Sequence, residues 1–270
     1  MTAPRGAAFR RARIGTLLLV LAVVAMWASS VRRQRQERRA WDRTLEVGLV
    51  ILARDPDGER AAATLRSGVP VLERRLAQEM ERHRGPGPAP FAFRVATLPA
   101  WQGEMPLRPR SDGIVDRALH AWDLRRFRRE VDAAAGLDPA ALDDCLYVLL
   151  ERPEAGAAAT FAEGSGAAGG EVGLVRAWVE GGDATLSLAA LAHELLHNVG
   201  ASDKYDGAGH AREPEGLAEP GLVPRYPQRF AEWMVGEVAL GPGRGCLPAS
   251  LAELGVGPAT AREIGWTAGR

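Results

Sequence analysis

The stretch from Leu188 to Asp206 constrains the fold of this chain more than any other. It contains His193 and His197, whose four-residue spacing places both imidazoles on one face of a helix, one turn apart. Apolar residues recur there at three- and four-residue spacing: Leu188, Leu191, Leu195 and Val199. No Pro or Gly interrupts residues 186–199, and Gly200 follows as a stop signal. The sequence therefore predicts an amphipathic helix that ends soon after His197.

These residue types at this spacing indicate a metal site. Two neutral imidazoles one helical turn apart can bind one divalent cation, and zinc (Zn²⁺) is the usual occupant. Glu194 follows His193 directly, where its carboxylate can take a proton from a metal-bound water. Gly200 permits a sharp turn, so Asp203, ten residues after His193, can return to the metal as a third ligand. Three other residues are candidates for that third place: Glu232, His210 and Glu219.

The pattern from His193 to Asp203, H-E-x-x-H-x-x-G-x-x-D, resembles the signature of the metzincin group of zincin metalloproteases, with Asp in place of the usual third His. The segment from His193 to Glu232 also resembles an uncharacterised group of bacterial membrane-anchored proteins. The metzincin resemblance implies zinc held by the two histidines and Asp203, and a Met-containing turn beneath the metal. Met234 is the downstream candidate for that turn, and a core methionine is the alternative interpretation.

The resemblance further implies hydrolysis of peptide bonds by a metal-activated water, with Glu194 as the general base. Tyr205 and Tyr226 are candidates for hydrogen-bonding the oxyanion, or they carry structural hydroxyls. Two alternatives stay open. One is a catalytically inactive zincin-fold binding module tethered to the membrane, which would hold zinc without cleaving peptides. The other is an anchored structural or interaction protein in which the motif is coincidental, so that His193→Ala would leave metal content unchanged.

Residues 14–31 carry no charged side chain and predict a single transmembrane helix within an anchor segment, residues 1–31. Eighteen helical residues reach about 27 Å, close to the hydrocarbon thickness of a bilayer. A cleaved secretory signal is the alternative, because Ala28-Ser29-Ser30 resembles a weak cleavage site. Five arginines that follow at once oppose export and favour an uncleaved anchor: Arg32, Arg33, Arg35, Arg38 and Arg39.

The predicted location is therefore the cell membrane. Basic residues flank the apolar run on both sides, so the charge pattern leaves open which side of the membrane the body occupies. Residues 32–43 form a basic juxtamembrane linker that can rest on anionic headgroups, and the N-terminal helix itself contacts lipid.

The charge distribution discounts nucleic acid as a partner. Residues 5–43 hold ten Arg against two acidic residues, a net charge of +8, in a chain whose formal net charge is zero. The remainder of the chain is therefore acidic, which does not suit a phosphate backbone. Cys145 and Cys246 lack the spacing of a metal or redox motif, and either one disulfide or two free thiols fits them.

Residues 44–270 alternate strands and helices, which predicts an α/β domain with a mixed twisted sheet over the metal helix. The resemblance implies the α+β arrangement of the zincins for the same elements. The expected strands are residues 45–52, 91–98, 145–150 and 172–179. The expected helices before the metal helix are residues 59–84, interrupted near Gly68 and Pro70, and residues 114–131, with Leu119, Trp122, Leu124 and Phe127 as packing residues. A turn is expected at residues 55–58 and a mobile loop at residues 154–170.

In zincin proteases the last strand before the active-site helix is antiparallel and lies at the sheet edge, where it pairs with an extended substrate. The resemblance therefore implies that a peptide or protein substrate binds along residues 172–179 as such an edge strand. An ordinary edge strand without a ligand is the alternative. The proline-rich residues 207–229 predict an irregular loop, and residues 250–254 and 259–266 predict short closing helices.

Overall fold

The computed structural model describes residues 5–111, 113–152, 162–166, 170–179 and 182–267. The chain divides into two compact units, Met1–Ala40 and Trp41–Arg270. The first unit contains helix α1 (Arg5–Ala40), which is long and apolar enough to cross a membrane. The helix continues through most of the basic segment that was expected to be a linker and ends at Ala40.

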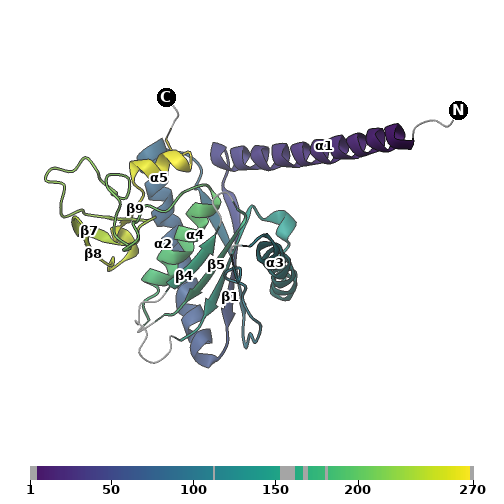
Figure 1. Ribbon diagram of the computed structural model, residues 1–270. Helices are drawn as coiled ribbons and strands as arrows, with labels where there is room; N and C mark the ends of the chain where they lie inside the picture. Colours follow the sequence, from purple (N-terminus) through teal and green to yellow (C-terminus); the bar gives the residue numbers. More distant parts are fainter. Residues whose placement is uncertain (1–4, 112, 153–161, 167–169, 180–181, 268–270) are drawn as a thin grey trace. The chain divides into compact units, whose positions relative to one another are not determined.

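A five-stranded sheet forms the centre of the second unit, with strand order β2-β1-β3-β5-β4 (Figure 1). Its strands are β1 (Leu45–Ala53), β2 (Phe91–Leu98), β3 (Asp144–Leu150), β4 (Ala162–Gly166) and β5 (Val172–Ala177). The pairs β1–β2, β1–β3 and β3–β5 are parallel, and β4 is antiparallel to β5. The four strands predicted from the sequence are all present, and the mixed α/β class with a mostly parallel sheet is confirmed.

The edge position of the sheet was assigned to the wrong strand. The strand predicted at residues 172–179 is β5, which pairs with β3 on one side and with β4 on the other, so it lies inside the sheet. The strand at this edge of the sheet is β4, which lies within the segment expected to be a mobile loop. Its sequence, Ala-Glu-Gly-Ser-Gly, has no apolar alternation, which is why periodicity did not reveal it. Residues 153–161 and 167–169 of that segment lie outside the described residues.

Helices cover both faces of the sheet (Figure 1). Helices α2 (Pro56–Arg84) and α4 (Thr185–Asn198) pack on one face, and α3 (Ile114–Ala135) packs on the other. The expected break in α2 is wrong: the helix runs through Gly68 and Pro70. Gly68 serves close packing instead, because a Cβ there would lie 2.5 Å from Leu188 Cδ1 on α4.

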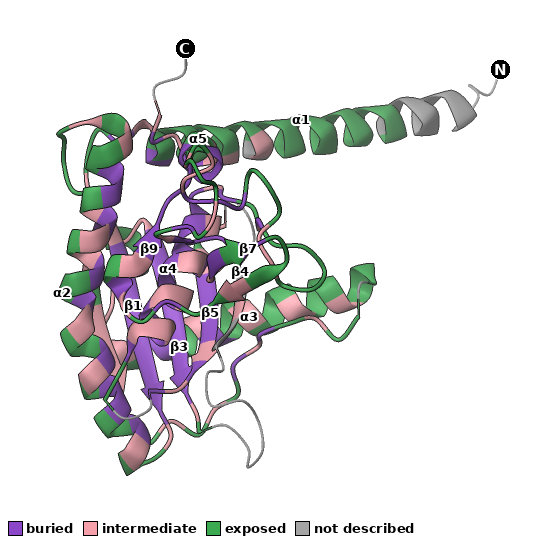
Figure 2. Cartoon of the chain, turned by 90° about the vertical axis from the view of Figure 1, so that its left-hand side faces the viewer, coloured by how far each residue is buried: buried purple, intermediate pink, exposed green. Residues whose placement is uncertain are grey.

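Two further expectations about the helices differ from the structure. The turn signal at residues 55–58 starts α2: the Asp55 carboxylate accepts a hydrogen bond from Gly58 N (2.7 Å) and Pro56 fills the first turn. On α3, Phe127 is buried and Leu124 is half-buried against the core, but Leu119 and Trp122 are exposed. The first half of α3 extends past the sheet (Figure 2), and its large apolar residues remain exposed.

The C-terminal region wraps around α2 and α4 with little regular structure, as its proline content predicted. Its elements are β6 (Ala231–Glu232) paired with β9 (Leu254–Gly255), the hairpin β7 (Val238–Gly241) and β8 (Arg244–Cys246), the 3₁₀ turn η2 (Leu251–Glu253) and α5 (Pro258–Glu263). A second 3₁₀ turn, η1 (Pro139–Ala141), precedes β3. Both cysteines are free thiols, Cys145 buried and Cys246 exposed, so they do not form the disulfide that the sequence left open.

Candidate metal centre

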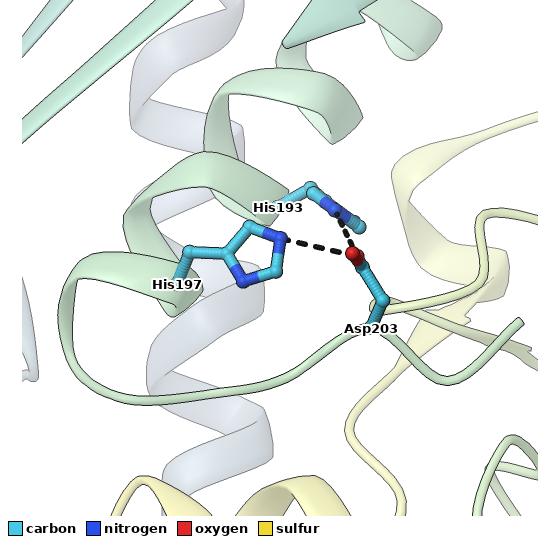
Figure 3. A group of neighbouring side chains, drawn as sticks. All are labelled: His193, His197 and Asp203. Atoms are coloured by element: carbon cyan, nitrogen blue, oxygen red, sulfur yellow. Dashed lines mark ion pairs between the residues drawn. The ribbon is translucent and has the colours of Figure 1, made fainter. Parts of the chain in front are cut away.

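His193, His197 and Asp203 form a group that could hold a metal ion, because their ligand atoms lie within 4.8 Å of one another. The Nε2 atoms of His193 and His197 lie 3.2 Å and 3.1 Å from the same atom, Asp203 Oδ1 (Figure 3). The two histidines project from α4 and Asp203 comes from the loop after it. The structure thus brings together the three residues that the sequence ranked first.

Local backbone geometry explains this convergence. The four-residue spacing on α4 leaves the two imidazole rings with centroids 4.7 Å apart. After Asn198 the chain reverses: Gly200 has φ +109°, a conformation that suits glycine. Hydrogen bonds from Gly200 N to His197 O (2.9 Å) and from Ala201 N to Leu196 O (2.9 Å) close the turn. The next residues therefore run back along the helix end and carry Asp203 to the histidines.

The second ring nitrogen of each histidine faces a backbone carbonyl. His193 Nδ1 lies 3.1 Å from Trp233 O, and His197 Nδ1 lies 2.9 Å from Ala201 O. A carbonyl oxygen only accepts, so each Nδ1 carries a hydrogen, and each Nε2, which faces Asp203, is the ring atom that could bind a metal. Such outer hydrogen bonds orient metal-binding histidines and raise their basicity.

The electrostatics of the cluster favour positive charge at its centre. Burial lowers the pKa of His193, but the hydrogen bond to Asp203 and the charge of Glu194 outweigh it, so that the net shift is upward. Burial and the charge of His193 lower the pKa of His197. The hydrogen bond from His193 lowers the pKa of Asp203, which keeps that carboxylate ionised. An ionised carboxylate with two inward-facing imidazoles suits a divalent cation.

Glu194 lies beside this group, with its side chain buried between α4 and strands β4 and β5. Its side chain is 5 % exposed, and among the described residues no donor reaches its buried Oε2. Burial raises the pKa of Glu194 to about 7, partly offset by the charge of His193. A carboxyl group with that pKa can both accept and release a proton near neutral pH.

Two glycines that the sequence reading did not single out make room for Glu194. A Cβ on Gly164 of β4 would collide with the Glu194 carboxylate, and one on Gly173 of β5 would lie 2.9 Å from Glu194 Cβ. The backbones of these strands therefore approach α4 at the acidic side chain. For Gly173 the available signal was a glycine inside an expected strand, which often marks a close approach; Gly164 lay in a segment expected to be a loop and gave no such signal.

Of the two tyrosines considered for oxyanion contact, Tyr205 borders the cluster. Its hydroxyl hydrogen-bonds Asp203, and burial together with the Asp203 charge raises its pKa. The Tyr226 hydroxyl donates instead to Glu213. Arg108, from the loop between β2 and α3, contributes positive charge at both Glu194 and Tyr205.

The rival third ligands have other partners. Glu232 lies on β6 and is buried, where it accepts hydrogen bonds from Thr260 Oγ1 (2.6 Å) and from the amide of Gly257. His210 Nδ1 lies 3.1 Å from Glu237, and Glu219 pairs with Arg229. Within the described ranges, only the His193 cluster brings three such ligands together. No protein-family model matches the chain, and no curated protein sequence matches it.

Met234 lies fully buried in a turn that supports the cluster. Amides of Val235 and Gly236 both donate to Glu232 O (2.9 Å each), which closes the turn. The neighbouring Trp233 carbonyl faces His193, as described above. The Met234 carbonyl accepts a hydrogen bond from Lys204 N (3.0 Å), in the loop that bears Asp203. One turn therefore contacts both the histidine helix and the aspartate loop.

Lys204 fixes the same loop from its other side. This residue is the only lysine of the chain, and its ammonium group is buried. Nζ donates to Ser202 O (2.8 Å), to Ser202 Oγ (2.7 Å) and to Glu263 of α5 (2.6 Å). A buried ammonium group needs such partners, and here they hold the residues on both sides of Asp203. The isolated lysine within the motif was the only sequence signal of this role.

Proposed function

We propose that this protein is a membrane-anchored zinc metallopeptidase, a zincin of the metzincin type. The observation that carries the proposal is the convergence of two imidazole nitrogens on one Asp203 oxygen at 3.1–3.2 Å, beside a buried carboxyl group whose pKa is about 7. Two nitrogen ligands and one oxygen ligand suit a catalytic zinc site, which keeps a fourth position open.

The chain's own residues would divide the chemistry as follows. Zinc bound by His193, His197 and Asp203 would lower the pKa of a water towards neutrality and polarise the scissile carbonyl. Glu194 accepts the proton of the attacking water and delivers it to the leaving amine. Tyr205, at the edge of the cluster, donates a hydrogen bond to the oxyanion. The turn around Met234 positions His193 through the Trp233 carbonyl.

The peptide substrate is proposed to lie along β4. This strand ends the sheet in the described part of the chain, so its outer backbone groups can pair with an extended peptide. Gly164 brings that strand against Glu194, so a peptide paired with β4 would lie near the proposed proton acceptor. Strand β5, the site expected from the sequence, pairs on both sides and cannot serve.

Helix α1 is proposed to be a single-pass anchor in the cell membrane. Its apolar segment contacts the lipid tails, and its basic continuation to Ala40 lies near the headgroups.

The test combines metal analysis with peptide cleavage by the full chain in detergent. Wild-type protein should bind one zinc ion per chain and cleave members of a broad peptide library. Glu194→Gln should retain zinc but lose at least about 100-fold in turnover, the usual contribution of a general base. Glu215→Gln, which alters an exposed carboxylate, is the matched control and should match wild type.

Three results would contradict parts of this proposal. Undiminished turnover by Glu194→Gln would remove its role as the base. Zinc binding without cleavage by the wild type would leave a metal-binding module. Unchanged metal content in His193→Ala would show that the cluster holds no metal.

A further inference from the structure

The first half of α3 presents an apolar surface with no partner in the described structure. Four large side chains there are unusually exposed: Ile114 85 %, Val115 67 %, Leu119 53 % and Trp122 64 %. Val115, Leu119 and Trp122 follow at spacings of four and three, so they lie on one side of the helix. Figure 2 shows that this end of α3 extends away from the sheet. Grouped exposed apolar residues on one helix face usually mark a contact surface.

The same side of α3 becomes basic towards its C-terminus. Arg125 and Arg129 continue the spacing from Trp122, and Arg126 lies beside them; all three are exposed. A pocket of about 720 Å³ lies between the C-terminal half of α3 and the chain that follows the helix. Its lining includes Trp122, Arg125, Arg128 and Arg129. The one carboxylate in its lining, Asp132, already accepts a hydrogen bond from Tyr147 (2.6 Å). Asp123 and Glu130 lie at the margin of this surface, because each is rotated about 100° around the helix from the residue before it, Trp122 and Arg129. We call the surface formed by these exposed residues the α3 face: Ile114, Val115, Leu119, Trp122, Arg125, Arg126 and Arg129.

We propose that the α3 face docks on an anionic phospholipid membrane. Trp122 and the three aliphatic side chains enter the interfacial layer, and the arginines at the pocket bind lipid phosphates. Helices with an apolar part and arginines bind in this way, through buried apolar area together with attraction to anionic lipid. Guanidinium groups also match phosphate oxygens in geometry and charge.

The length of the chain keeps the start of the body within reach of a bilayer. Only nine residues separate Val31, the end of the apolar run, from Trp41, where the body begins. Nine residues span at most about 30 Å even when fully extended. This inference rests on the α1 anchor of the proposed function, and it is independent of the metal site.

A second copy of the chain fits the α3 face less well. In a two-fold symmetric contact each face meets its own copy. A contact centred on the basic part of the face would bring Arg125, Arg126 and Arg129 close to their equivalents, and such like-charge contacts oppose association. A contact centred on the apolar part would leave these arginines without an anionic partner. The charge of the face therefore favours an anionic surface over itself.

The experiment places an environment-sensitive fluorophore on the α3 face of the full chain in vesicles. Cys246→Ser removes the exposed thiol, and Leu119→Cys carries the label. Val71→Cys is the control, because Val71 is an exposed apolar residue of α2, which packs on the opposite face of the sheet. A lipid with a nitroxide near its headgroup quenches labels that lie at the interface. Vesicles contain phosphatidylcholine alone or with phosphatidylglycerol.

In vesicles with phosphatidylglycerol, the label at residue 119 should be quenched at least about twofold more than the label at residue 71. Arg125→Gln with Arg129→Gln, or omission of phosphatidylglycerol, should reduce that difference, because both remove the charge attraction. Free inorganic phosphate at the same charge concentration should not shield the label, which separates a membrane from a soluble anion.

Equal quenching at the two positions would overturn the docking proposal. So would shielding at residue 119 that depends on the protein-to-lipid ratio, which would indicate a second copy. Flotation of the same samples tests the anchor separately. Protein that floats with vesicles yet shows equal quenching contradicts the α3 face alone, whereas protein that does not float contradicts the anchor as well.

Discussion

Asp132 on α3 and Glu194 on α4 lie on opposite faces of one sheet and are equally buried, each 5 % exposed. Asp132 accepts a 2.6 Å hydrogen bond from Tyr147 of β3. Glu194 Oε2 has no donor among the described residues. Leaving a buried polar atom without a partner costs about 1–3 kcal/mol, so such an atom calls for a functional explanation. The two carboxylates are thus equally buried but differ in their hydrogen bonding, and the proposed function gives Glu194 Oε2 a role that Asp132 does not have.

The packing around the two carboxylates also differs: aromatic side chains surround Asp132, whereas glycines lie opposite Glu194. On the α3 side, Phe127 and Tyr147 fill the space with an edge-to-face contact, their ring centroids 5.3 Å apart. On the α4 side, Gly164 and Gly173 leave only backbone opposite Glu194. Aromatic side chains therefore close one face, whereas on the other face Glu194 lies against β4, the last strand of the sheet in the described part of the chain.

The largest effect is expected from Gly164→Ala, which would break the arrangement on the α4 side. The new methyl group would collide with the Glu194 carboxylate and displace it. A displacement of this kind can cost about 100-fold in turnover, so peptide cleavage should fall by that factor while zinc content is retained. Cleavage kinetics and metal analysis of the same samples test this.

Gly87→Ala is the matched control, because its Cβ would meet nothing within 4 Å. It should cleave as fast as wild type. Wild-type turnover by Gly164→Ala would show that the position of Glu194 does not matter to the reaction.

A second prediction concerns Glu232, a carboxylate on the α4 side that is buried but has partners. Burial raises its pKa to about 7, although hydrogen bonds from Thr260 and Gly257 oppose the shift. In the unfolded chain the pKa is near its ordinary value of 4.5, so between these values the unfolded state binds fewer protons than the folded state. The free energy of unfolding therefore falls as pH rises, by about 2 kcal/mol between pH 5 and 8.

Urea unfolding of wild type and Glu232→Gln at several pH values tests this. The variant should lose that part of the pH dependence, since its amide does not titrate, and it should keep its zinc. Parallel pH profiles would contradict the assignment of Glu232 as a protonated structural carboxyl group. Loss of zinc at all pH values would instead restore it as a ligand.

The sequence predicted what depends on local spacing and missed what depends on neighbours. The spacing of His193 and His197 and the turn at Gly200 are local, so the ligand group could be predicted before any tertiary contact was known. Strand β4 could not, because five small and polar residues form a strand only through pairing with β5.

The same distinction applies to α3 and to Glu232. Apolar periodicity marks Leu119 and Trp122 correctly as one side of a helix, but periodicity does not tell whether another element covers that side. Glu232 lies on β6, a two-residue strand that exists through its pairing with β9, and no local pattern reveals such a strand. The support from Lys204 also needs Glu263, nearly sixty residues away, and no local pattern connects the two.

Tyr147→Phe should lower the free energy of unfolding by a smaller amount than the effects above. It tests the difference between Asp132 and Glu194. Removing the hydroxyl leaves Asp132 Oδ1 without this donor, at a cost of about 1–2 kcal/mol in the free energy of unfolding. Glu194→Gln loses no donor to its Oε2 and should unfold within about 0.5 kcal/mol of wild type. Urea unfolding of both variants compares them directly. An equal loss in the two would mean that the two carboxylates are both structural.

The smallest effect is expected from Leu119→Ser, measured in detergent as the free energy of unfolding. Because more than half of Leu119 is exposed, the change should stay within about 0.5 kcal/mol. Phe127→Ala, two turns further along α3, removes a buried aromatic ring and should cost about 3–5 kcal/mol. A large loss from Leu119→Ser would mean that another part of the chain covers the α3 face, which would then belong to the core and could not meet a membrane.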